Sequence, residues 1–368
     1  MAFDIPYPPN YGGVIDIYYK IKKLNEIGCQ IILHTYEYGS RKKIKKLNEL
    51  CTEVYYYKRK RSLKYFFSFT PFIVVSRTSK KLSERLQNNH YPIIFEGLHT
   101  TAPLIYNKAL CKRAFVRTHN IEHQFYFGLC KSEQSLFKKI FFWTEGLKLK
   151  RYEKILDKVE GVFTISKADQ KYFSTKYGNK TKYIPVFHPT KTPSITVFPN
   201  TEKFLLYHGD LRVPDNVRAS IYLINIFKNS PYRLVIASSF EKKCILKQIA
   251  KHKNVSFKNI TDKNDLSQLL AKAQINILVT FQKTGIKLKL MNCLFKGKHI
   301  IANTKMIDGT GLENLCHLAN SKQEILEQTK KLIAQEFVQN DRAKRKHKLK
   351  EFCPLNAAAC IQSIIFKL

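Results

Sequence analysis

The sequence has few acidic residues, no long apolar run and no apolar leader. Its 28 Asp and Glu stand against 64 Lys and Arg, so the formal net charge is +36. A surplus of this size attracts anionic partners such as phospholipid head groups, nucleic acid or phosphorylated substrates. No stretch approaches the ~18 uninterrupted apolar residues of a membrane span, and the first residues lack a basic and apolar leader. We therefore expect neither a transmembrane helix nor a signal peptide.

The sequence also lacks paired cysteines. Its nine Cys are scattered, none forms a C-x-x-C pair, and several lie inside apolar runs. This distribution predicts reduced core residues of a cytosolic protein and argues against a disulfide framework or a zinc site.

Hydrophobic residues make up 44% of the 368 positions, which is enough for two domains with full cores. Short apolar runs rich in β-branched residues alternate with helical patterns, which predicts parallel α/β sheets. Between the two halves, 188–202 contains three prolines and predicts a linker. Strands are expected in the first half at 29–34, 92–99, 114–120, 162–166 and 183–186, and in the second at 204–210, 233–237, 255–257, 275–280 and 298–303.

The chain opens with a predicted strand at 1–5, a Pro-rich turn and the pair Gly12-Gly13, followed by a predicted helix over 14–27. A glycine loop at the first strand-to-helix junction is where ligands approach open α/β sheets. Five residues are short for a central strand, so we expect the natural reading frame to begin upstream and to supply further apolar residues.

Polar side chains follow two of the predicted strands. Glu96 and His99 end the run that begins at Pro92, and His119 and Asn120 end the next run. Polar groups at strand ends point into the crevice of an α/β sheet. The H-N-x-E-H spacing that starts at His119 matches no helical zinc motif, so no metal site is expected.

A strand–loop–helix–strand unit spans 275–303. Gly285 stands where the loop turns into the helix, and Lys287 and Lys289 fall in the first helical turn. The helix dipole is positive at that end and repels cations. A bound phosphate or diphosphate would hold both lysines together with the free backbone N–H groups. The alternative is that both lysines are simply solvated.

Basic and aromatic residues interleave in two segments, 58–82 and 137–151. Rings and lysines together suit an anionic membrane interface or single-stranded nucleic acid. The alternative is that the rings lie in the core and the lysines in solvent. We expect the two segments to form one apolar and basic patch on the first domain.

Several motifs follow one another through nearly the whole chain. They are P-x-P-x-x-x-G-G at 6–13, R-T-H-N at 117–120, T-I-S at 164–166, H-G-D-L and P-D-N within 208–216, G-I-K-L-K-L at 285–290 with Gly297, and D-G-T-G-L-E at 308–313. In order and spacing they resemble a GT-B glycosyltransferase of the group 1 type, the retaining family 4. That resemblance implies an α/β fold in which two Rossmann-like domains face each other across a cleft and the C-terminal helix crosses back to the first domain. We expect an acceptor-side domain over 1–190, a nucleotide-sugar-binding domain over 191–352 and the returning helix over 353–368.

The resemblance also implies roles for the matching residues. His119 would be the catalytic residue that contacts the transferred sugar. A nucleotide sugar would be the donor substrate, and neither a metal nor another cofactor is expected. The acceptor side would include Asn10, Glu96, His99 and Asn120. The donor side would include Gly12, Gly13, Gly209, Arg212, Gly285, Lys287, Lys289 and Asn292.

Two departures from the family pattern concern the donor side. The family's E-x7-E glutamates align with Thr284 and Asn292, and its arginine and lysine pair aligns with Asp210 and Asn216. An amide at Asn292 can still bond a ribose hydroxyl. The available replacement cations are Arg212, Arg218, Lys287 and Lys289.

These expectations combine into a cytoplasmic, retaining hexosyltransferase at the anionic inner face of the cell membrane. It would build a cell-surface polysaccharide or a lipid-linked glycan, with no nucleic-acid partner. The alternatives are a degenerate, non-catalytic binding subunit of the same fold and a basic nucleic-acid-binding protein.

Overall fold

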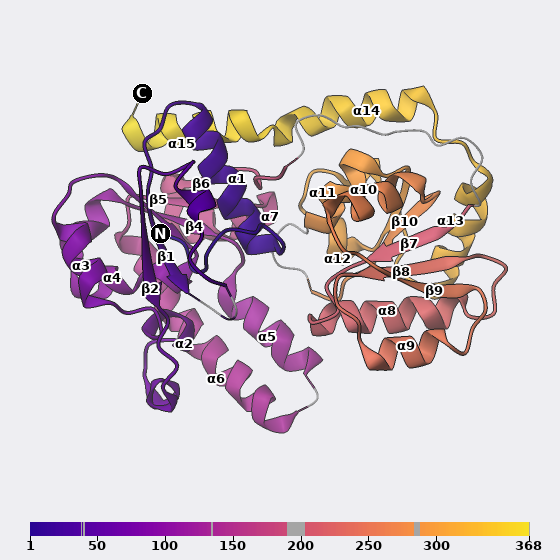
Figure 1. Cartoon of the computed structure of the whole chain (residues 1–368), viewed down its shortest axis with the longest axis horizontal. Coiled ribbons are helices and arrows are strands. Elements are labelled where there is room, and N and C mark those ends of the chain that lie inside the picture. Colours follow the sequence, from indigo (N-terminus) through magenta and orange to yellow (C-terminus); the bar gives the residue numbers. More distant parts are fainter. Residues whose placement is uncertain (38, 40, 134, 190–202, 283–287, 368) are drawn as a thin grey trace. The chain divides into compact units, whose positions relative to one another are not determined.

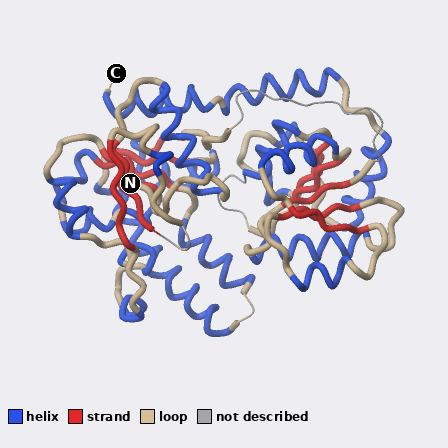
Figure 2. Tube along the Cα trace, viewed as in Figure 1, coloured by secondary structure: helices blue, strands red, loops and turns tan. Residues whose placement is uncertain are grey.

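The computed structural model describes residues 1–37, 39, 41–133, 135–189, 203–282 and 288–367. The chain divides into two compact units. Unit 1 comprises residues 1–189 and 352–368, and unit 2 comprises residues 190–351. Within each unit, parallel strands form the centre and helices cover them (Figure 2).

In unit 1 the start of the chain joins two groups of parallel strands. Ala2 pairs with Thr35 of one group, and the backbone N–H of Glu96 in the other donates to the carbonyl of Met1 at 3.0 Å. The strand predicted at 1–5 is therefore a single bridge. It stops there because the Asp4 carboxylate accepts from the backbone N–H of Ile5 at 2.8 Å, and this local bond turns the chain away from the sheet.

The strand order in unit 1 is β1–β2 in one group and β3–β4–β5–β6 in the other. The strands are β1 (Ile32–Glu37), β2 (Glu53–Lys58), β3 (Ile93–Glu96), β4 (Ala114–Thr118), β5 (Gly161–Thr164) and β6 (Thr181–Tyr183). The helices are α1 (Gly12–Glu26), α2 (Phe72–Val75), α3 (Lys80–Gln87), α4 (Ala102–Tyr106), α5 (Glu122–Ser132), α6 (Leu136–Tyr152), α7 (Lys167–Tyr177) and α15 (Pro354–Phe366).

The last helix, α15, packs in unit 1 beside α1 (Figure 1). Its Ala358 and Ile361 lie in a buried cluster with Leu24 of α1 and Phe115 of β4. Helices α5 and α6 run side by side as a hairpin that projects from the body of the unit (Figure 1).

Unit 2 contains one parallel sheet in the order β12–β11–β10–β7–β8–β9. Its strands are β7 (Leu205–His208), β8 (Leu234–Ser238), β9 (Val255–Asn259), β10 (Ile275–Leu278), β11 (His299–Ala302) and β12 (His317–Leu318). Its helices are α8 (Pro214–Phe227), α9 (Lys243–Ile249), α10 (Lys263–Lys272), α11 (Leu288–Lys296), α12 (Thr304–Ile307), α13 (Lys322–Ala334) and α14 (Gln339–Leu349). Central strand β10 is buried along its length, as expected for a strand paired on both edges and covered on both faces.

Among the helices that the structure describes, none combines the length and the apolar character needed to cross a lipid bilayer.

Candidate active site

Two charged residues of α1 face two charged residues at the carboxyl ends of β3 and β4 in unit 1. Asp16 and Lys20 are one turn apart on α1, and Glu96 and Arg117 are direct partners in the register of β3 and β4. All four are buried, the most accessible being Lys20 at 3%. Buried charges are costly unless they are paired, so this arrangement depends on each charge meeting its opposite.

The pairing is complete and it includes His119, the residue that follows β4. Arg117 binds Asp16 at both ends of its guanidinium group, with Nε 2.6 Å from Oδ2 and Nη2 2.8 Å from Oδ1. Lys20 bonds to Oε1 of Glu96, and Nε2 of His119 lies 2.9 Å from Oε2 of the same carboxylate. We call these five residues the His119 cluster.

Both carboxylates of the His119 cluster are held ionised. Burial by itself opposes ionisation, but Lys20 and the hydrogen bond from His119 outweigh it and lower the pKa of Glu96 to about 2. Burial is likewise outweighed at Asp16, where the Arg117 guanidinium holds the pKa well below its ordinary value. Glu96 was expected on the acceptor side. Both of its oxygens bond to protein groups, one of them to His119, so Glu96 orients that imidazole ring; its place on the acceptor side stays a prediction.

The ring of Phe3 lies against both predicted histidines. Its centroid is 5.1 Å from that of His99 and 5.6 Å from that of His119, the second contact being edge-on. A Cβ atom added to Gly13 would lie 2.5 Å from Cζ of Phe3, so the glycine lets the ring approach the first turn of α1. Gly12 begins that turn.

The other expected acceptor-side residues occupy different settings. Asn10 is exposed, and its amide oxygen accepts from Arg41, which also donates to the carbonyls of Ile5 (2.6 Å) and Pro8 (3.0 Å). Asn10 therefore belongs to a loop that one arginine holds in shape. Asn120 is half-buried directly after His119.

His99 and Glu122 form a second pair near Phe3, in which Glu122 is buried and His99 is half-buried. Nδ1 of His99 lies 3.9 Å from Oε1 of Glu122, and neither atom has a hydrogen-bond partner. Burial, with a contribution from Asp169, raises the pKa of Glu122 to about 8, although a hydrogen bond from Asn120 opposes the shift. Glu122 is therefore a carboxyl group that stays protonated at neutral pH.

One trio among the described residues has the geometry of a metal site. Ligand atoms of Asp16, Glu96 and His119 lie within 4.8 Å of one another. However, Arg117 and Lys20 already bind the two carboxylates, and two buried cations beside the trio would repel a divalent ion. This donor set therefore does not fit a metal ion. That the protein works without a metal remains a prediction.

In unit 2 the predicted donor-side cation, Lys289, meets the first turn of α8 and the end of β7. Nζ of Lys289 lies 2.8 Å from Oδ1 of Asn216 and 3.3 Å from the hydroxyl of Tyr207, over whose ring it also sits at 5.0 Å. A Cβ atom on Gly209 would lie 2.9 Å from Cγ of Asn216, so Gly209 makes room for this amide. We call Tyr207, Gly209, Asn216 and Lys289 the Lys289 cluster.

This cluster places a cation where the resemblance expects one. The lysine of the family pattern aligns with Asn216, and here the ammonium of Lys289 arrives beside Asn216 from α11. Arg212 is exposed and is bound by Asp210, with Nη2 2.7 Å from Oδ2. Asn292 is half-buried on α11, one turn after Lys289. The predicted residues Gly285 and Lys287, and Thr284 of the E-x7-E alignment, lie outside the described residues.

Several residues in or beside these clusters were not predicted from the sequence: Phe3, Asp16, Lys20, Tyr207 and Asp215. The spacing of Asp16 and Lys20 was an available signal, because both fall on the face of α1 that carries Ile17 and Ile21. Asp215 accepts from the hydroxyl of Thr280 at 2.6 Å and from the backbone N–H of Phe281 at 3.0 Å. It thereby ties the start of α8 to the segment after β10.

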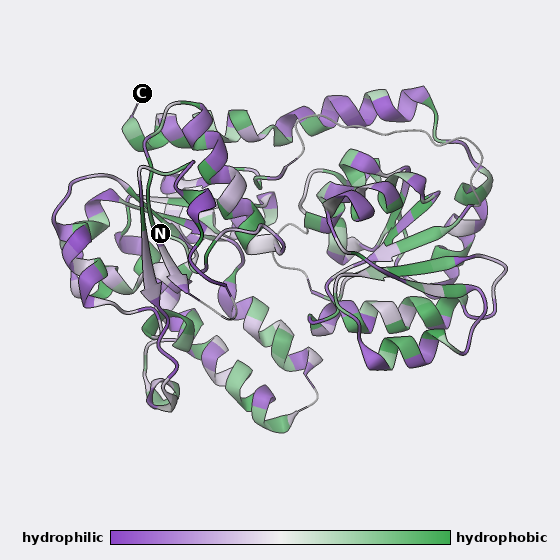
Figure 3. Cartoon of the chain, viewed as in Figure 1, coloured by the Kyte–Doolittle hydropathy of each residue, from purple (hydrophilic) through white to green (hydrophobic). Residues whose placement is uncertain are grey.

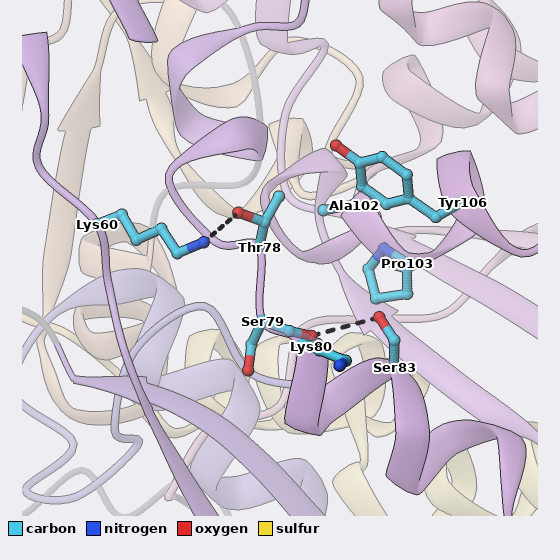
Figure 4. Close-up of a pocket in the computed structure, with 8 residues that line it drawn as sticks. All are labelled: Lys60, Thr78, Ser79, Lys80, Ser83, Ala102, Pro103 and Tyr106. Carbon is cyan, nitrogen blue, oxygen red and sulfur yellow. Dashed lines mark hydrogen bonds between the residues drawn. The ribbon is translucent and has the colours of Figure 1, made fainter. Parts of the chain in front are cut away.

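A pocket of about 250 Å³ in unit 1 lies apart from the predicted site residues, none of which lines it. Figure 4 shows Lys60 bonded to Thr78 at 3.2 Å on one side, with Ser79 and Ser83 on the other. Hydroxyl and ammonium groups give this pocket a polar, basic wall.

No family model matches the chain, but a bacterial protein resembles it in sequence. A Klebsiella pneumoniae protein described as an uncharacterized 44.6 kDa protein in the cps region is 27% identical over 345 residues, covering 89% of this chain and 87% of that protein.

Solved structures match over the full length of the chain. A glycosyltransferase from Rickettsia africae has a TM-score of 0.62 at 11% identity and is covered over 98% of its length. HepE of Anabaena, solved with UDP and glucose, has a TM-score of 0.65 at 13% identity and is covered over 99%. The OtsA trehalose-6-phosphate synthase has a TM-score of 0.64 at 10% identity and is covered over 99%. The chain therefore has the α/β fold of the GT-B glycosyltransferases.

Proposed function

We propose that the protein is a retaining glycosyltransferase that moves a hexose from a nucleotide-sugar donor to a cell-surface glycan or a lipid-linked acceptor. The observation that carries this proposal is the position of Lys289, whose ammonium lies 2.8 Å from the Asn216 amide beside Gly209. A fold match alone assigns no chemistry, whereas a fixed cation beside a glycine at the end of a parallel strand is suited to a diphosphate.

In the proposed reaction, the bond between the anomeric carbon of the sugar and the diphosphate breaks, and the diphosphate leaves with the electron pair. The oxygen of the acceptor hydroxyl bonds to the same face of the anomeric carbon, and its proton passes to the departing diphosphate. Lys289 stabilises the negative charge that collects on this leaving group. His119 contacts the transferred sugar, and Glu96 holds the imidazole ring in one orientation. These roles require protein side chains alone, in line with the expectation of no metal.

Two of the comparisons support the choice of substrates. HepE was solved with UDP and glucose, so UDP-hexoses are the first donors to test. The Klebsiella relative is described by its place in a cps region, which supports an acceptor that leads to a surface polysaccharide. We further propose that the protein works in the cytoplasm, peripherally at the inner face of the membrane.

Thermal-shift screening against UDP-, GDP-, ADP- and CMP-sugars tests the proposal. We expect one nucleotide class to raise the melting temperature in a concentration-dependent way and its sugar nucleotide to be turned over. A shift without turnover on any acceptor would identify a degenerate binding subunit. No shift with any nucleotide sugar would overturn the proposed function.

A further inference from the structure

The two aromatic and basic segments of the sequence meet in unit 1 and form one surface. The ring of Phe66 stacks on Phe72 at 4.9 Å and meets Phe141 of α6 edge-on at 5.3 Å. Lys148 of α6 donates to the carbonyl of Phe66 at 2.7 Å, and Glu145 accepts from the backbone N–H of Phe72 at 2.6 Å. The loop around the short helix at 63–67 is thus fastened to α6.

Helix α6 buries an acidic residue and exposes a row of apolar ones. Glu145 is buried at 1%, whereas Leu136, Ile140, Trp143 and Leu147 are exposed at 73%, 55%, 53% and 43%. These four positions are spaced by four, three and four residues, so they lie on one face of the helix. Figure 3 shows hydrophobic residues along this hairpin although it projects from the body of the unit.

The loop and the start of α6 expose further rings. Phe67 and Phe69 are exposed at 89% and 88%, and Phe137 at the start of α6 is exposed at 82%. Side chains of this size normally lie in the core, and a group of them exposed on one part of a molecule marks an interaction site. We call the exposed apolar side chains of 66–69 and α6 the apolar patch.

The charge around the apolar patch is mostly positive, although Glu133 lies 4.0 Å from Lys138 of α6. Residues 58–81 include eight Lys and Arg and no acidic residue, and residues 136–151 include five Lys and Arg and one acidic residue, the buried Glu145. Two of these lysines, Lys60 and Lys80, line the pocket of Figure 4. Any partner must therefore combine an apolar region with a negatively charged surface.

We infer that the apolar patch is a docking surface for the head-group region of an anionic bilayer, with the phenylalanine rings and Trp143 inserted among the lipids and the lysines on the head groups. Lipid chains can surround the aliphatic side chains of Leu136, Ile140 and Leu147. Nucleic acid binds by stacking its bases on aromatic rings, and it has no comparable contact for aliphatic side chains. A second copy would bring two basic surfaces together. This inference deepens the proposed function, because a lipid-linked acceptor resides in such a bilayer.

Trp143 makes the test direct because it is the chain's single tryptophan. The probes are vesicles of phosphatidylcholine mixed with phosphatidylglycerol, and vesicles of phosphatidylcholine alone. With the anionic vesicles we expect a blue shift of the tryptophan emission and quenching by brominated lipid chains, both reduced by added salt. Binding without any change in Trp143 emission would overturn the inference, and so would the absence of binding.

Two variants with matched controls separate the two parts of the surface. Exchanging Lys58, Lys64 and Lys139 for Gln should lower vesicle partitioning by about 100-fold. The same exchange at the exposed Lys251, Lys253 and Lys330 of unit 2 should lower it far less.

The second variant tests the apolar part of the surface. Exchanging Phe67, Phe69 and Phe137 for Ser should lower partitioning by about tenfold or more. Ser at the exposed Phe240, Leu318 and Val338 of unit 2 should have little effect. Equal losses in variants and controls would overturn the assignment of this surface.

The other occupants have their own signatures. A change in Trp143 emission with single-stranded DNA but not with vesicles would reassign the patch to nucleic acid. A change that follows protein concentration without lipid would reassign it to a second copy. The measurement needs neither donor nor turnover, so a failed vesicle assay leaves the transferase proposal intact and a failed transferase assay leaves the vesicle result intact.

Discussion

The imidazole Nε2 of His119 lies 2.9 Å from Oε2 of Glu96, and the other oxygen of that carboxylate binds the ammonium of Lys20. This chain of contacts runs from the loop after β4 through the end of β3 to α1. It fixes the plane of a ring that would otherwise rotate freely at the end of a strand. The resemblance names His119 as the residue that contacts the sugar, and the structure supplies the groups that hold it.

Replacement of His119 by Ala should lower turnover by about 100-fold while changing the folding stability little. Stability is preserved because Glu96 keeps its bond to Lys20 when the imidazole is removed. Turnover and chemical denaturation measured on the same preparation check this, with His90→Ala, at an exposed histidine of the same unit, as the control. Loss of folding with normal activity per folded molecule would make His119 a structural histidine.

Glu96→Gln should lower kcat by about tenfold and leave the donor Kd unchanged, because the charge-assisted bond to His119 becomes a neutral one. The single variant also leaves Lys20 buried without a counter-charge and should lose stability. The double variant Lys20→Met with Glu96→Gln removes both charges and should recover that stability while kcat stays low. Recovery of kcat along with stability would show that Glu96 serves the fold alone.

Lys289→Ala should weaken donor binding by about one to two decades, since a charge-assisted hydrogen bond is worth roughly 1.5–3 kcal/mol. Asn292→Ala should cost less, about one decade, because it removes a neutral bond. Both side chains are half-buried, so the fold should survive. Calorimetric titration of the donor is the measurement, with Lys296→Ala in the last turn of the same helix as the control. Normal binding in Lys289→Ala with weakened binding in Lys287→Ala would move the phosphate contact to Lys287, and normal binding in both would remove this helix start from the donor site.

The stability of unit 1 should depend on pH through Glu122, whose pKa burial raises to about 8. The unfolded chain releases this proton near pH ~4.3, so the folded state holds one more proton between that pH and about 8. The free energy of unfolding contributed by Glu122 is therefore full below the unfolded pKa and falls as pH rises, by up to about 1.4 kcal/mol per pH unit.

Glu122→Gln should remove this slope and make the protein relatively more stable at pH 8 than at pH 5, compared with the unaltered chain. Denaturant titrations at several pH values check this, and Glu84→Gln at an exposed glutamate is the matched control. The difference between the two variants cancels the slopes of all other groups. Parallel pH profiles for Glu122→Gln and Glu84→Gln would contradict the prediction.

The local pattern of apolar residues predicted most of the strands. The apolar runs at 275–280 and 298–303 became β10 (Ile275–Leu278) and β11 (His299–Ala302), and the helical spacing between them became α11. Strand β2 was missed because Glu53–Lys58 is a run of tyrosines between charged ends, with a half-buried face that apolar periodicity does not reveal. Helix α14 (Gln339–Leu349) was not predicted either; its Arg345 donates to the carbonyls of Gly297 and Lys298.

Periodicity and composition were enough to predict the two α/β halves, most of their strands and the two aromatic and basic segments. Both act over a few residues. The tertiary structure decided which charges pair, because Lys20 and Glu96 are 76 positions apart and Arg117 and Asp16 are 101 apart. No local pattern contains such a pairing; it arises when packing removes water and leaves each buried charge to find its opposite. The same holds for Lys289 and Asn216, 73 positions apart, which meet because α11 packs over the end of β7.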